Sequence, residues 1–432
     1  MQRIAVIGTG YVGLVTAACL SDLGNQVICV DNDRKKLENL KKGIIPIYEP
    51  GLEELISKNC HKKRISFSYS IADAAKKSEI IFICVGTPAQ ADGGADLAAV
   101  EKVATEIAKA IKGYTVIVSK STVPTQTGEK IRRTIEILAG KNAAFDVVSN
   151  PEFLREGQAI SDTMHPDRIV IGVASKRAET IMRQLYSPIK APILVTNIAT
   201  AELIKHAANS FLSTKISYIN ALANICEKVG ADVEMVAEGI GMDKRIGRQF
   251  FNAGPGFGGY CFPKDLDAFI HIAHKNGYDF ELLKAVRKIN EDQKKVVLKK
   301  IEDALWIIKD KTIAVLGLSF KPNSDDIRNS ISIELIKSLK AGGAKIRAYD
   351  PKAMDKAKLV LKGVTFVKDP YQAAKGANCI LIMTDWPEFA EFDFEKIKKL
   401  LFQPIIVDTR NMFNPAKMGA LGFIYKCIGR SA

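Results

Sequence analysis

Residues 3–13 read Arg3-Ile-Ala-Val-Ile-Gly-Thr-Gly-Tyr-Val-Gly13, an apolar run followed at once by the spacing Gly-x-Gly-x-x-Gly. The apolar run predicts a buried strand, and the apolar residues 14–23, which end at Gly24, predict a helix. A second apolar run, residues 27–30, ends in Asp31. Three glycines between a strand and a helix are the fingerprint of a dinucleotide-binding βαβ unit. The stretch therefore predicts a doubly wound parallel sheet of the α/β class.

Each glycine of this turn has its own purpose. Gly8 makes the turn, Gly10 lets a pyrophosphate approach the helix N-terminus, and Gly13 lets the helix pack on the strand. Asp31 stands where a carboxylate accepts the ribose hydroxyls of adenosine and repels a 2′-phosphate. We therefore expect NAD rather than NADP, although Lys36 is a cation nearby. The alternative is a glycine cluster that packs a helix and binds no ligand.

Three further loops follow predicted strands and carry polar side chains: Thr87, Thr122, and Glu152 with Glu156. Ligands of open α/β sheets lie at the carboxyl ends of the strands, so we expect these loops to face the cofactor. The two threonines fit plain turns equally well. The two carboxylates are candidates for acid–base work only if other groups converge on them.

Residues 200–228 contain no proline or glycine and are rich in Ala, Leu, Ile and Asn. This pattern predicts one long helix, which we expect to be the spine between two domains and a dimer surface. An ordinary core helix is the alternative. Lys205 and Asn209 are four residues apart and so share a face that is otherwise mostly apolar.

A single cysteine stands between a glycine-rich loop and a predicted helix in Gly254-Pro-Gly-Phe-Gly-Gly-Tyr-Cys261-Phe-Pro-Lys-Asp-Leu-Asp267. Pro263 suits the first position of a helix, so Cys261 is expected just before a helix N-terminus. The partial positive charge there, with Lys264 close by, favours the nucleophilic thiolate. Cys261 is therefore the candidate nucleophile, and a buried, inert cysteine is the alternative.

The chain repeats its first unit after about residue 310. A strand at residues 312–316 leads to Gly317, and a strand at residues 344–349 ends in Asp350. We therefore expect two doubly wound, Rossmann-like domains at residues 1–199 and 311–432, joined by a central helical region at residues 200–310 that holds the cysteine loop.

The repeated turn lacks the second and third glycines of the first. Lys321 and Arg328 stand in the loop instead. Because these cations suit phosphate oxygens, we expect a nucleotide diphosphate there rather than a second NAD.

The composition is that of an ordinary globular protein, with 432 residues, 47% hydrophobic and 25% charged. The eight cysteines form no Cys-x-x-Cys pair and the five histidines no His-Glu-x-x-His motif, so no metal site or disulfide framework is expected. The net charge of +14 comes from lysines spread along the chain, which does not favour nucleic acid. No apolar run reaches membrane-spanning length and no signal peptide is recognised, so we expect a cytoplasmic protein without membrane contact.

Several motifs together resemble the UDP-glucose 6-dehydrogenases, within the UDP-glucose/GDP-mannose dehydrogenase family: Gly8 to Gly13, Asn150-Pro-Glu-Phe-Leu-Arg-Glu-Gly157, Pro166-Asp-Arg-Ile-Val170, Lys205 with Asn209, Gly256-Phe-Gly-Gly-x-Cys-Phe-Pro-Lys-Asp265 and Phe320-Lys-Pro. The resemblance covers nearly the whole chain. It implies two Rossmann-like domains joined by a long helix through which two chains dimerise. It also implies the four-electron oxidation of UDP-glucose to UDP-glucuronate with two NAD⁺ in succession.

The resemblance further implies roles for the matching residues. Cys261 would bind the intermediate aldehyde as a thiohemiacetal and then a thioester. Lys205 and Asp265 would handle protons and stabilise the oxyanion, and Asn209 would position the sugar. Glu152 and Thr122 would order the hydrolytic water. The implied NAD contacts are Gly8, Gly10, Tyr11, Val12, Gly13, Asp31, Lys36, Thr87, Thr122, Glu156, Lys264 and Arg328. The implied substrate contacts are Glu152, Phe153, Leu154, Arg155, Glu156, Lys205, Asn209, Phe250, Phe251, Asn252, Ala253, Gly254, Gly258, Lys321 and Arg410, with Arg245 reaching the substrate of the partner subunit.

One residue departs from the family pattern. Tyr260 stands before the cysteine where the family usually has serine, and a larger side chain there could reshape the sugar pocket. The same chemistry on UDP-N-acetylmannosamine, UDP-N-acetylglucosamine or GDP-mannose is therefore an alternative. A protein that senses NAD or binds nucleic acid without turnover is the alternative from another class.

Overall fold

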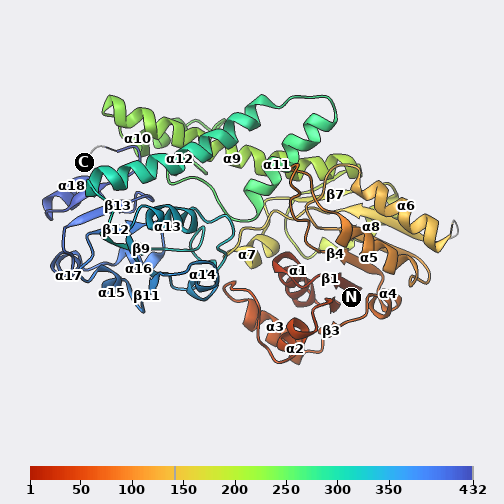
Figure 1. The fold of residues 1–432 in the computed structure, drawn as a ribbon. Helices are drawn as coiled ribbons and strands as arrows, with labels where there is room; N and C mark the ends of the chain where they lie inside the picture. Colours follow the sequence, from red (N-terminus) through yellow and green to blue (C-terminus); the bar gives the residue numbers. More distant parts are fainter. Residues whose placement is uncertain (141–142, 431–432) are drawn as a thin grey trace. The chain divides into compact units, whose positions relative to one another are not determined.

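The computed structural model describes residues 1–140 and 143–430, in two compact units (Figure 1). The first unit consists of Met1–Ala208 and Asp267–Tyr278, and the second of Asn209–Leu266 and Asp279–Ala432. Two helices belong to both units: α9 (Ile198–Val229) and α11 (Cys261–Lys275). No helix in the described part of the chain is both long enough and apolar enough to cross a membrane.

The first unit is built on an eight-stranded sheet in the order β3-β2-β1-β4-β5-β6-β7-β8. Its strands are β1 (Arg3–Ile7), β2 (Gln26–Val30), β3 (Ile65–Ser68), β4 (Ile80–Ile83), β5 (Thr115–Ser119), β6 (Phe145–Ser149), β7 (Ile169–Gly172) and β8 (Ile193–Thr196). Its helices are α1 (Tyr11–Asp22), α2 (Arg34–Lys41), α3 (Leu52–His61), α4 (Ile71–Lys77), α5 (Ala98–Ala108), α6 (Thr127–Ala139), α7 (Ala159–Met164) and α8 (Lys176–Tyr186).

The predicted strands are mostly apolar because the sheet is covered on both faces. Successive residues of β1 enter different cores: Ile4 and Val6 join one cluster, whereas Ala5 and Ile7 join another. The strand order reverses between β1 and β4, which is the switch point where such sheets bind ligands. One pair, β6 with β7, is antiparallel, which the sequence pattern did not indicate.

The second unit repeats the arrangement with a six-stranded parallel sheet in the order β11-β10-β9-β12-β13-β14. The strands are β9 (Thr312–Leu316), β10 (Lys345–Tyr349), β11 (Thr365–Phe366), β12 (Cys379–Ile382), β13 (Ile405–Asp408) and β14 (Ile424–Lys426). The helices are α10 (Val233–Gly241), α12 (Glu281–Leu305), α13 (Ile331–Ala341), α14 (Met354–Val360), α15 (Pro370–Ala374), α16 (Pro387–Ala390), α17 (Phe394–Leu400) and α18 (Pro415–Ala420). The predicted α/β architecture of two doubly wound sheets joined by a long helix is therefore confirmed.

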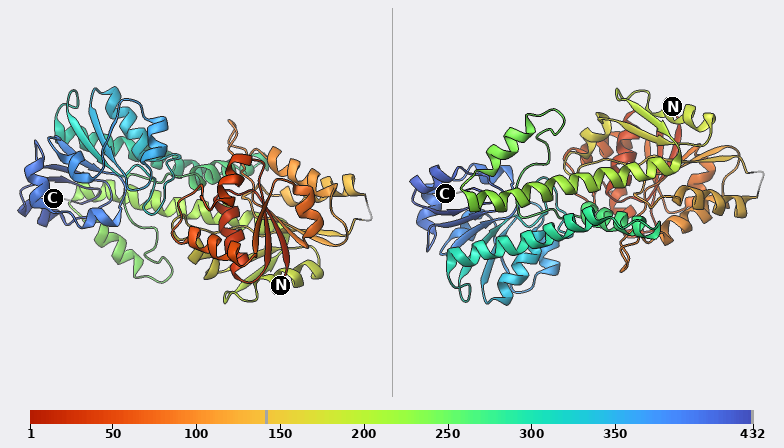
Figure 2. Two further views of the ribbon diagram at one scale, coloured as in Figure 1. Left: turned by 90° about the horizontal axis from the view of Figure 1, so that it is seen from below. Right: turned by 90° about the horizontal axis from the view of Figure 1, so that it is seen from above.

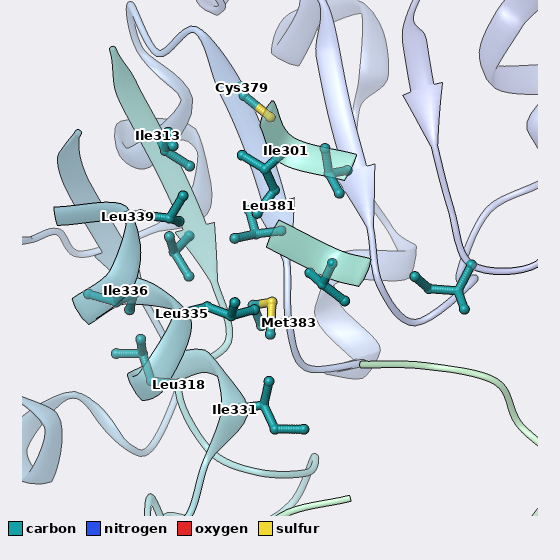
Figure 3. Packing of buried hydrophobic residues seen from close by; sticks show 14 of the residues in the cluster. Ile301, Ile313, Leu318, Ile331, Leu335, Ile336, Leu339, Cys379, Leu381 and Met383 are labelled. Carbon is teal, nitrogen blue, oxygen red and sulfur yellow. The ribbon is translucent and has the colours of Figure 1, made fainter. Parts of the chain in front are cut away.

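The core of the second unit packs helix side chains on one face of its sheet (Figure 3). Leu335, Ile336 and Leu339 of α13 face Ile313 of β9 and Leu381 of β12 in this cluster. Helix α12 adds Ile301, and the second half of α9 adds further residues to the same core. Close packing on this face fixes the end of β9, from which the next loop starts.

Helix α9 is one unbroken helix, and α12 runs beside its second half (Figure 2). The Ser217 hydroxyl donates to the Val286 carbonyl (3.0 Å), and the Asn224 amide donates to Gln293 Oε1 (3.1 Å). These polar contacts between two long helices fix their register. The helix predicted at residues 200–228 is observed with two more residues at its start and one at its end.

Candidate active site

The glycine turn after β1 leaves room for a ligand at one position only. A Cβ atom on Gly8, whose φ is 99°, would lie 2.6 Å from the Cys84 carbonyl oxygen, and one on Gly13 would lie 1.8 Å from the Gly8 carbonyl oxygen. A Cβ on Gly10 would meet nothing within 4 Å. Gly10 is also the N-cap of α1 and has no side-chain cap, so the helix N-terminus faces this space. The turn fits a pyrophosphate.

Asp31 is held as an anion beside this turn. Its Oδ2 accepts hydrogen bonds from the Thr9 amide (2.9 Å), the Thr9 hydroxyl (2.5 Å) and the Lys36 ammonium (2.8 Å). Burial opposes ionisation, but the bonds from Lys36 and Thr9 outweigh it and lower the pKa of Asp31 to about 2. A fixed carboxylate here fits the ribose of NAD. The contact with Thr9 was not predicted, because a threonine between two glycines gives no signal of its own.

The loops after β4 and β5 lie against each other. The Thr87 hydroxyl donates to the Thr122 carbonyl (2.8 Å), and the Ser121 hydroxyl donates to the Val85 carbonyl (2.7 Å). The structure thus brings Thr87 and Thr122 together at the carboxyl edge of the sheet, next to the strand that carries the glycine turn.

A buried ion pair lies in the first unit between Lys205 of α9 and Glu152 of the loop after β6. The Lys205 Nζ is 3.1 Å from Glu152 Oε1, and Glu152 Oε2 accepts the Leu154 amide (2.6 Å). The guanidinium carbon of Arg168 lies 3.8 Å from the centroid of the Phe153 ring, and Lys205 Nζ lies 5.4 Å from the same centroid. Both side chains are buried, so this pair is shielded from bulk water.

Two buried charged residues of the first unit were missed by the sequence analysis. Lys120 follows β5 directly and donates to Asn150 Oδ1 (3.1 Å). Burial lowers the pKa of Lys120, with Cys84 and Glu152 opposing the shift and Lys205 adding to it. Glu49 accepts hydrogen bonds from the amides of Gly157 (2.6 Å) and Ala159 (2.7 Å) and also bonds the Tyr11 hydroxyl. A lysine directly after a wholly buried strand was the available signal for Lys120.

In the second unit, Asp265 is held from both sides. Its Oδ2 accepts the Asn209 amide (2.5 Å), and its Oδ1 accepts the Lys264 ammonium (2.6 Å). All three side chains are buried. Cys261 is exposed and lies four residues before Asp265 in α11, which places the sulfur and the carboxylate on one face of the helix.

Helix α11 begins at Cys261 and not at Pro263, so the cysteine is the first helical residue rather than the one before the helix. Proline is tolerated at the third position because the first four amides of a helix have no acceptor within it. The thiol still lies in the first turn, where the helix dipole favours an anion.

The other seven cysteines differ from Cys261 in burial. Six are buried and Cys60 is half-buried. Burial raises the pKa of each, to about 12 for Cys19, Cys84, Cys379 and Cys427. These thiols are therefore unreactive at neutral pH.

A small cavity in the second unit lies between the cysteine loop and the end of the second sheet. Its lining residues are Gly256, Gly258, Ser319, Phe320, Ser330, Ile331, Ser332, Met383 and Arg410. The Arg410 guanidinium is fixed there by the carbonyls of Met383 (2.8 Å) and Phe320 (3.1 Å). Lys321 follows Phe320, with Nζ 6.0 Å from its ring centroid. A cation beside the amides of a loop and the start of α13 suits a phosphate.

The predicted substrate segment at residues 250–254 is anchored to both long helices. The Gly254 amide donates to Asn220 Oδ1 (2.8 Å), and its carbonyl accepts from Gln293 (2.9 Å). Phe251 and Ala253 are buried, and Asn252 accepts from Arg248 (2.9 Å). Phe250 has a φ of 66°, which marks a tight bend at the start of the segment.

The second sheet has no place for a second dinucleotide in the position of the first. Asp350, the counterpart of Asp31, is fully buried and accepts the amides of Leu318 (2.7 Å) and Ser319 (3.1 Å) and the Trp386 indole (3.1 Å). The amides of Lys352 and Ala353 occupy its other oxygen. Because Asp350 has no exposed surface, a ribose cannot reach its oxygens, whereas Asp31 keeps some exposure.

The structure divides the predicted site residues between the units. Those in the first unit are Gly8, Gly10, Tyr11, Val12, Gly13, Asp31, Lys36, Thr87, Thr122, Glu152, Phe153, Leu154, Arg155, Glu156 and Lys205. Those in the second are Asn209, Arg245, Phe250, Phe251, Asn252, Ala253, Gly254, Gly258, Cys261, Lys264, Asp265, Lys321, Arg328 and Arg410.

Three predicted arginines pair with nearby carboxylates, and the first of them, Arg328, binds Asp326 (2.6 Å). Arg155 binds Asp162 (2.6 Å) and the exposed Arg245 binds Asp243 (2.6 Å). Within residues 1–140 and 143–430, no three His, Cys, Asp or Glu side chains form a group that could hold a metal ion.

Comparison with known proteins gives matches over most of the chain. Models of the UDP-glucose/GDP-mannose dehydrogenase family match as the NAD binding domain over residues 2–190, the central domain over residues 199–292 and the UDP binding domain over residues 314–415. The UDP-glucose 6-dehydrogenase TuaD of Bacillus subtilis is 49% identical, covering 100% of this chain and 94% of TuaD. The UDP-glucose 6-dehydrogenase of Rhizobium meliloti is 45% identical, covering 99% and 100%.

Solved structures agree with these sequence matches. A UDP-glucose dehydrogenase from Pyrobaculum islandicum is similar with a TM-score of 0.94 and 38% identity, over 100% of this chain and 98% of that one. A UDP-D-ManNAc dehydrogenase from Pyrococcus horikoshii is similar with a TM-score of 0.88 and 29% identity, over 99% of both chains.

Proposed function

We propose that this chain, which belongs to the UDP-glucose/GDP-mannose dehydrogenase family, oxidises UDP-glucose to UDP-glucuronate. Each turnover would consume two NAD⁺ and one water and release two NADH and three protons. The observation that carries the proposal is the exposed Cys261, one helical turn before a carboxylate fixed by Lys264 and Asn209. We assign residues 1–199 to the cofactor, residues 200–310 to the cysteine loop and dimer contact, and residues 311–432 to the UDP part of the substrate.

The first unit is suited to hold NAD, which accepts a hydride when bound. Gly10 leaves the space for the pyrophosphate, and Asp31 offers its carboxylate to the ribose. Thr87 and Thr122 lie at the next loops of the same sheet edge and are proposed cofactor contacts. Residues of this unit therefore bind and orient the cofactor.

Cys261 would supply the covalent step. Its thiolate adds to the carbonyl carbon of the aldehyde formed from the C6 alcohol, and the carbonyl oxygen takes a proton to give a thiohemiacetal. Loss of a hydride and a proton from this adduct gives a thioester. Water then attacks the thioester carbon, the C–S bond breaks, and the products are the carboxylate and the regenerated thiol.

The two buried charge clusters would handle the protons of these steps. In the first unit, Lys205 Nζ can give a proton to Glu152 or take one from it across 3.1 Å. In the second, the Lys264 ammonium and the Asn209 amide keep Asp265 in one orientation. We propose that Lys205, as a neutral amine, takes the proton of the C6 hydroxyl, that Glu152 orders the hydrolytic water, and that Asp265 accepts or donates a proton near the cysteine.

The identity of the hexose follows from the sequence relatives, and a comparison of sugars tests it. With saturating NAD⁺, kcat/KM for UDP-glucose should exceed that for UDP-N-acetylmannosamine by at least about tenfold, because an added acetamido group must fit a pocket built without it. The measurement is NADH absorbance with each sugar at equal enzyme concentration. A higher value for the N-acetyl sugar would show that the bulk of Tyr260 has changed the substrate.

We also propose a homodimer formed through α9. Large apolar side chains on this helix are exposed: Phe211 (64%), Tyr218 (52%) and Ile225 (54%) are spaced by seven residues and share a face. An apolar stripe of this length in water favours association with a second copy. Sedimentation equilibrium should give twice the mass of one chain, and a species with the mass of one chain would contradict this.

A further inference from the structure

The cysteine loop, residues 254–260, packs directly against the segment 318–331 of the same unit. We call this contact the clasp. A Cβ atom on Gly258 would lie 2.3 Å from the Asn329 carbonyl oxygen, and one on Gly259 would lie 2.8 Å from the Phe320 ring. The Asn329 side-chain amide donates to the Gly259 carbonyl (3.1 Å). The two backbones therefore touch directly, and only glycine permits this approach.

Tyr260 extends this contact to the residue next to the nucleophile. The Arg328 guanidinium carbon lies 4.3 Å from the centroid of the Tyr260 ring, and Lys264 Nζ lies 5.6 Å from it. Both distances are within the range of cation–π attraction. Arg328 is itself fixed by three side-chain hydrogen bonds to Asp326. The ring thus links the first turn of α11 to the segment 318–331.

The clasp also forms part of the cavity wall. Ser319, Phe320, Ser330 and Ile331 of this segment line the cavity, and Gly256 and Gly258 of the cysteine loop line it from the other side. A ligand that fills the cavity therefore contacts residues on both sides of the clasp. A loop with four glycines among residues 254–259 has much conformational freedom to lose when it does so.

We propose, given the proposed function in which this cavity holds the UDP part of the substrate, that Tyr260 is a positioning residue that couples occupation of the cavity to the reactivity of Cys261. UDP binds more tightly when the clasp is closed, and the closed clasp fixes the cysteine loop through the Tyr260 ring. Bound UDP therefore shifts the cysteine loop toward this one fixed conformation, in which the sulfur reacts more slowly with a small reagent from solution. The sugar is oriented against a nucleophile that is in place only when the nucleotide is bound.

The test uses UDP itself, because UDP lacks the hexose whose carbons could cover the sulfur. The folded protein is treated with iodoacetamide, with and without saturating UDP. The rate of Cys261 alkylation is then measured by mass spectrometry of its peptides after digestion. In the wild type, UDP should slow alkylation by at least about fivefold, the lower end of usual coupling energies. Tyr260→Ala should reduce this effect to less than about twofold, while Tyr260→Phe, which keeps the ring, should retain it.

UDP binding is measured in parallel by calorimetry on the same proteins. If UDP did not bind the wild type, the assignment of the cavity to UDP would be refuted, and the proposed coupling with it. UDP that binds but leaves alkylation unchanged would refute the coupling alone. A full UDP effect in Tyr260→Ala would also refute it, since a direct effect of the diphosphate charge would survive that change.

A second variant guards against misfolding of the first. Asn329 has a φ of 48°, a conformation that glycine adopts freely, so Asn329→Gly keeps a permitted backbone while removing the side-chain bond to Gly259. This variant should weaken the UDP effect as Tyr260→Ala does. If the effect were unchanged in Asn329→Gly, the clasp would not be the route of coupling.

Discussion

Cys261→Ala is expected to reduce turnover of UDP-glucose to UDP-glucuronate by more than the ~10²–10⁴-fold typical of losing one acid–base group. The variant removes the covalent route to the thioester, and no other exposed thiol in the described chain lies near Asp265 that could replace it. Calorimetry should show nearly unchanged binding of UDP-glucose, because the cavity that we assign to UDP is lined by other residues. The measurement is UDP-glucuronate formed per minute, followed by chromatography.

A matched control is Cys60→Ala, which removes a half-buried thiol on α3. Cys60→Ala should keep wild-type turnover. Any loss of turnover in Cys261→Ala can then be assigned to the thiol at position 261 and not to the removal of a thiol in general. Release of UDP-glucuronate by Cys261→Ala at a rate within tenfold of the wild type would remove the covalent mechanism. The fold and the cofactor site would not be affected by that result.

The second large effect is expected at the cofactor site. Asp31→Ala should narrow the preference for NAD⁺ over NADP⁺, measured as the ratio of kcat/KM values, by about 10²-fold or more. The variant loses hydrogen bonds from a charged acceptor to the ribose, at about 1.5–3 kcal/mol each. It also frees Lys36, now 2.8 Å from the carboxylate, to attract the 2′-phosphate.

Asp31→Asn separates the two causes. It keeps an oxygen that can accept from the ribose but loses the negative charge that repels the phosphate, so it should improve NADP⁺ while costing NAD⁺ less than Asp31→Ala does. Equal efficiency of the wild type with both cofactors would show that Asp31 does not select the cofactor. An unchanged ratio in Asp31→Ala would show the same.

The architecture followed from the sequence because its signals are local. The glycine turn at residues 8–13 needs a strand before it and a helix after it, and the structure has both as β1 and α1. The long helix was predictable because residues 200–228 lack every residue that would end it. The antiparallel pairing of β6 with β7 was not, since pairing direction depends on where the chain returns to the sheet and not on the strand's own residues.

Site residues could be predicted only where their chemistry stands out along the chain. Cys261 stands out beside its glycines, but its helix begins two residues earlier than Pro263 suggested, because a proline is allowed anywhere in the first turn. Lys120 and Glu49 were missed because their partners, Asn150 for the first and Gly157 with Ala159 for the second, are distant in sequence. Asp350 resembles Asp31 in sequence, and only its full burial and its bonds to backbone amides and to Trp386 show that its role is structural.

The central claim is a four-electron oxidation by one chain, and the yield of NADH per UDP-glucose tests it most directly. A limiting, known amount of UDP-glucose is incubated with excess NAD⁺ until absorbance at the NADH band stops rising. The account predicts two NADH for each UDP-glucose, with all sugar recovered as UDP-glucuronate, because Cys261 retains the aldehyde until the second oxidation is complete. One NADH per UDP-glucose, with free aldehyde as the product, would contradict it.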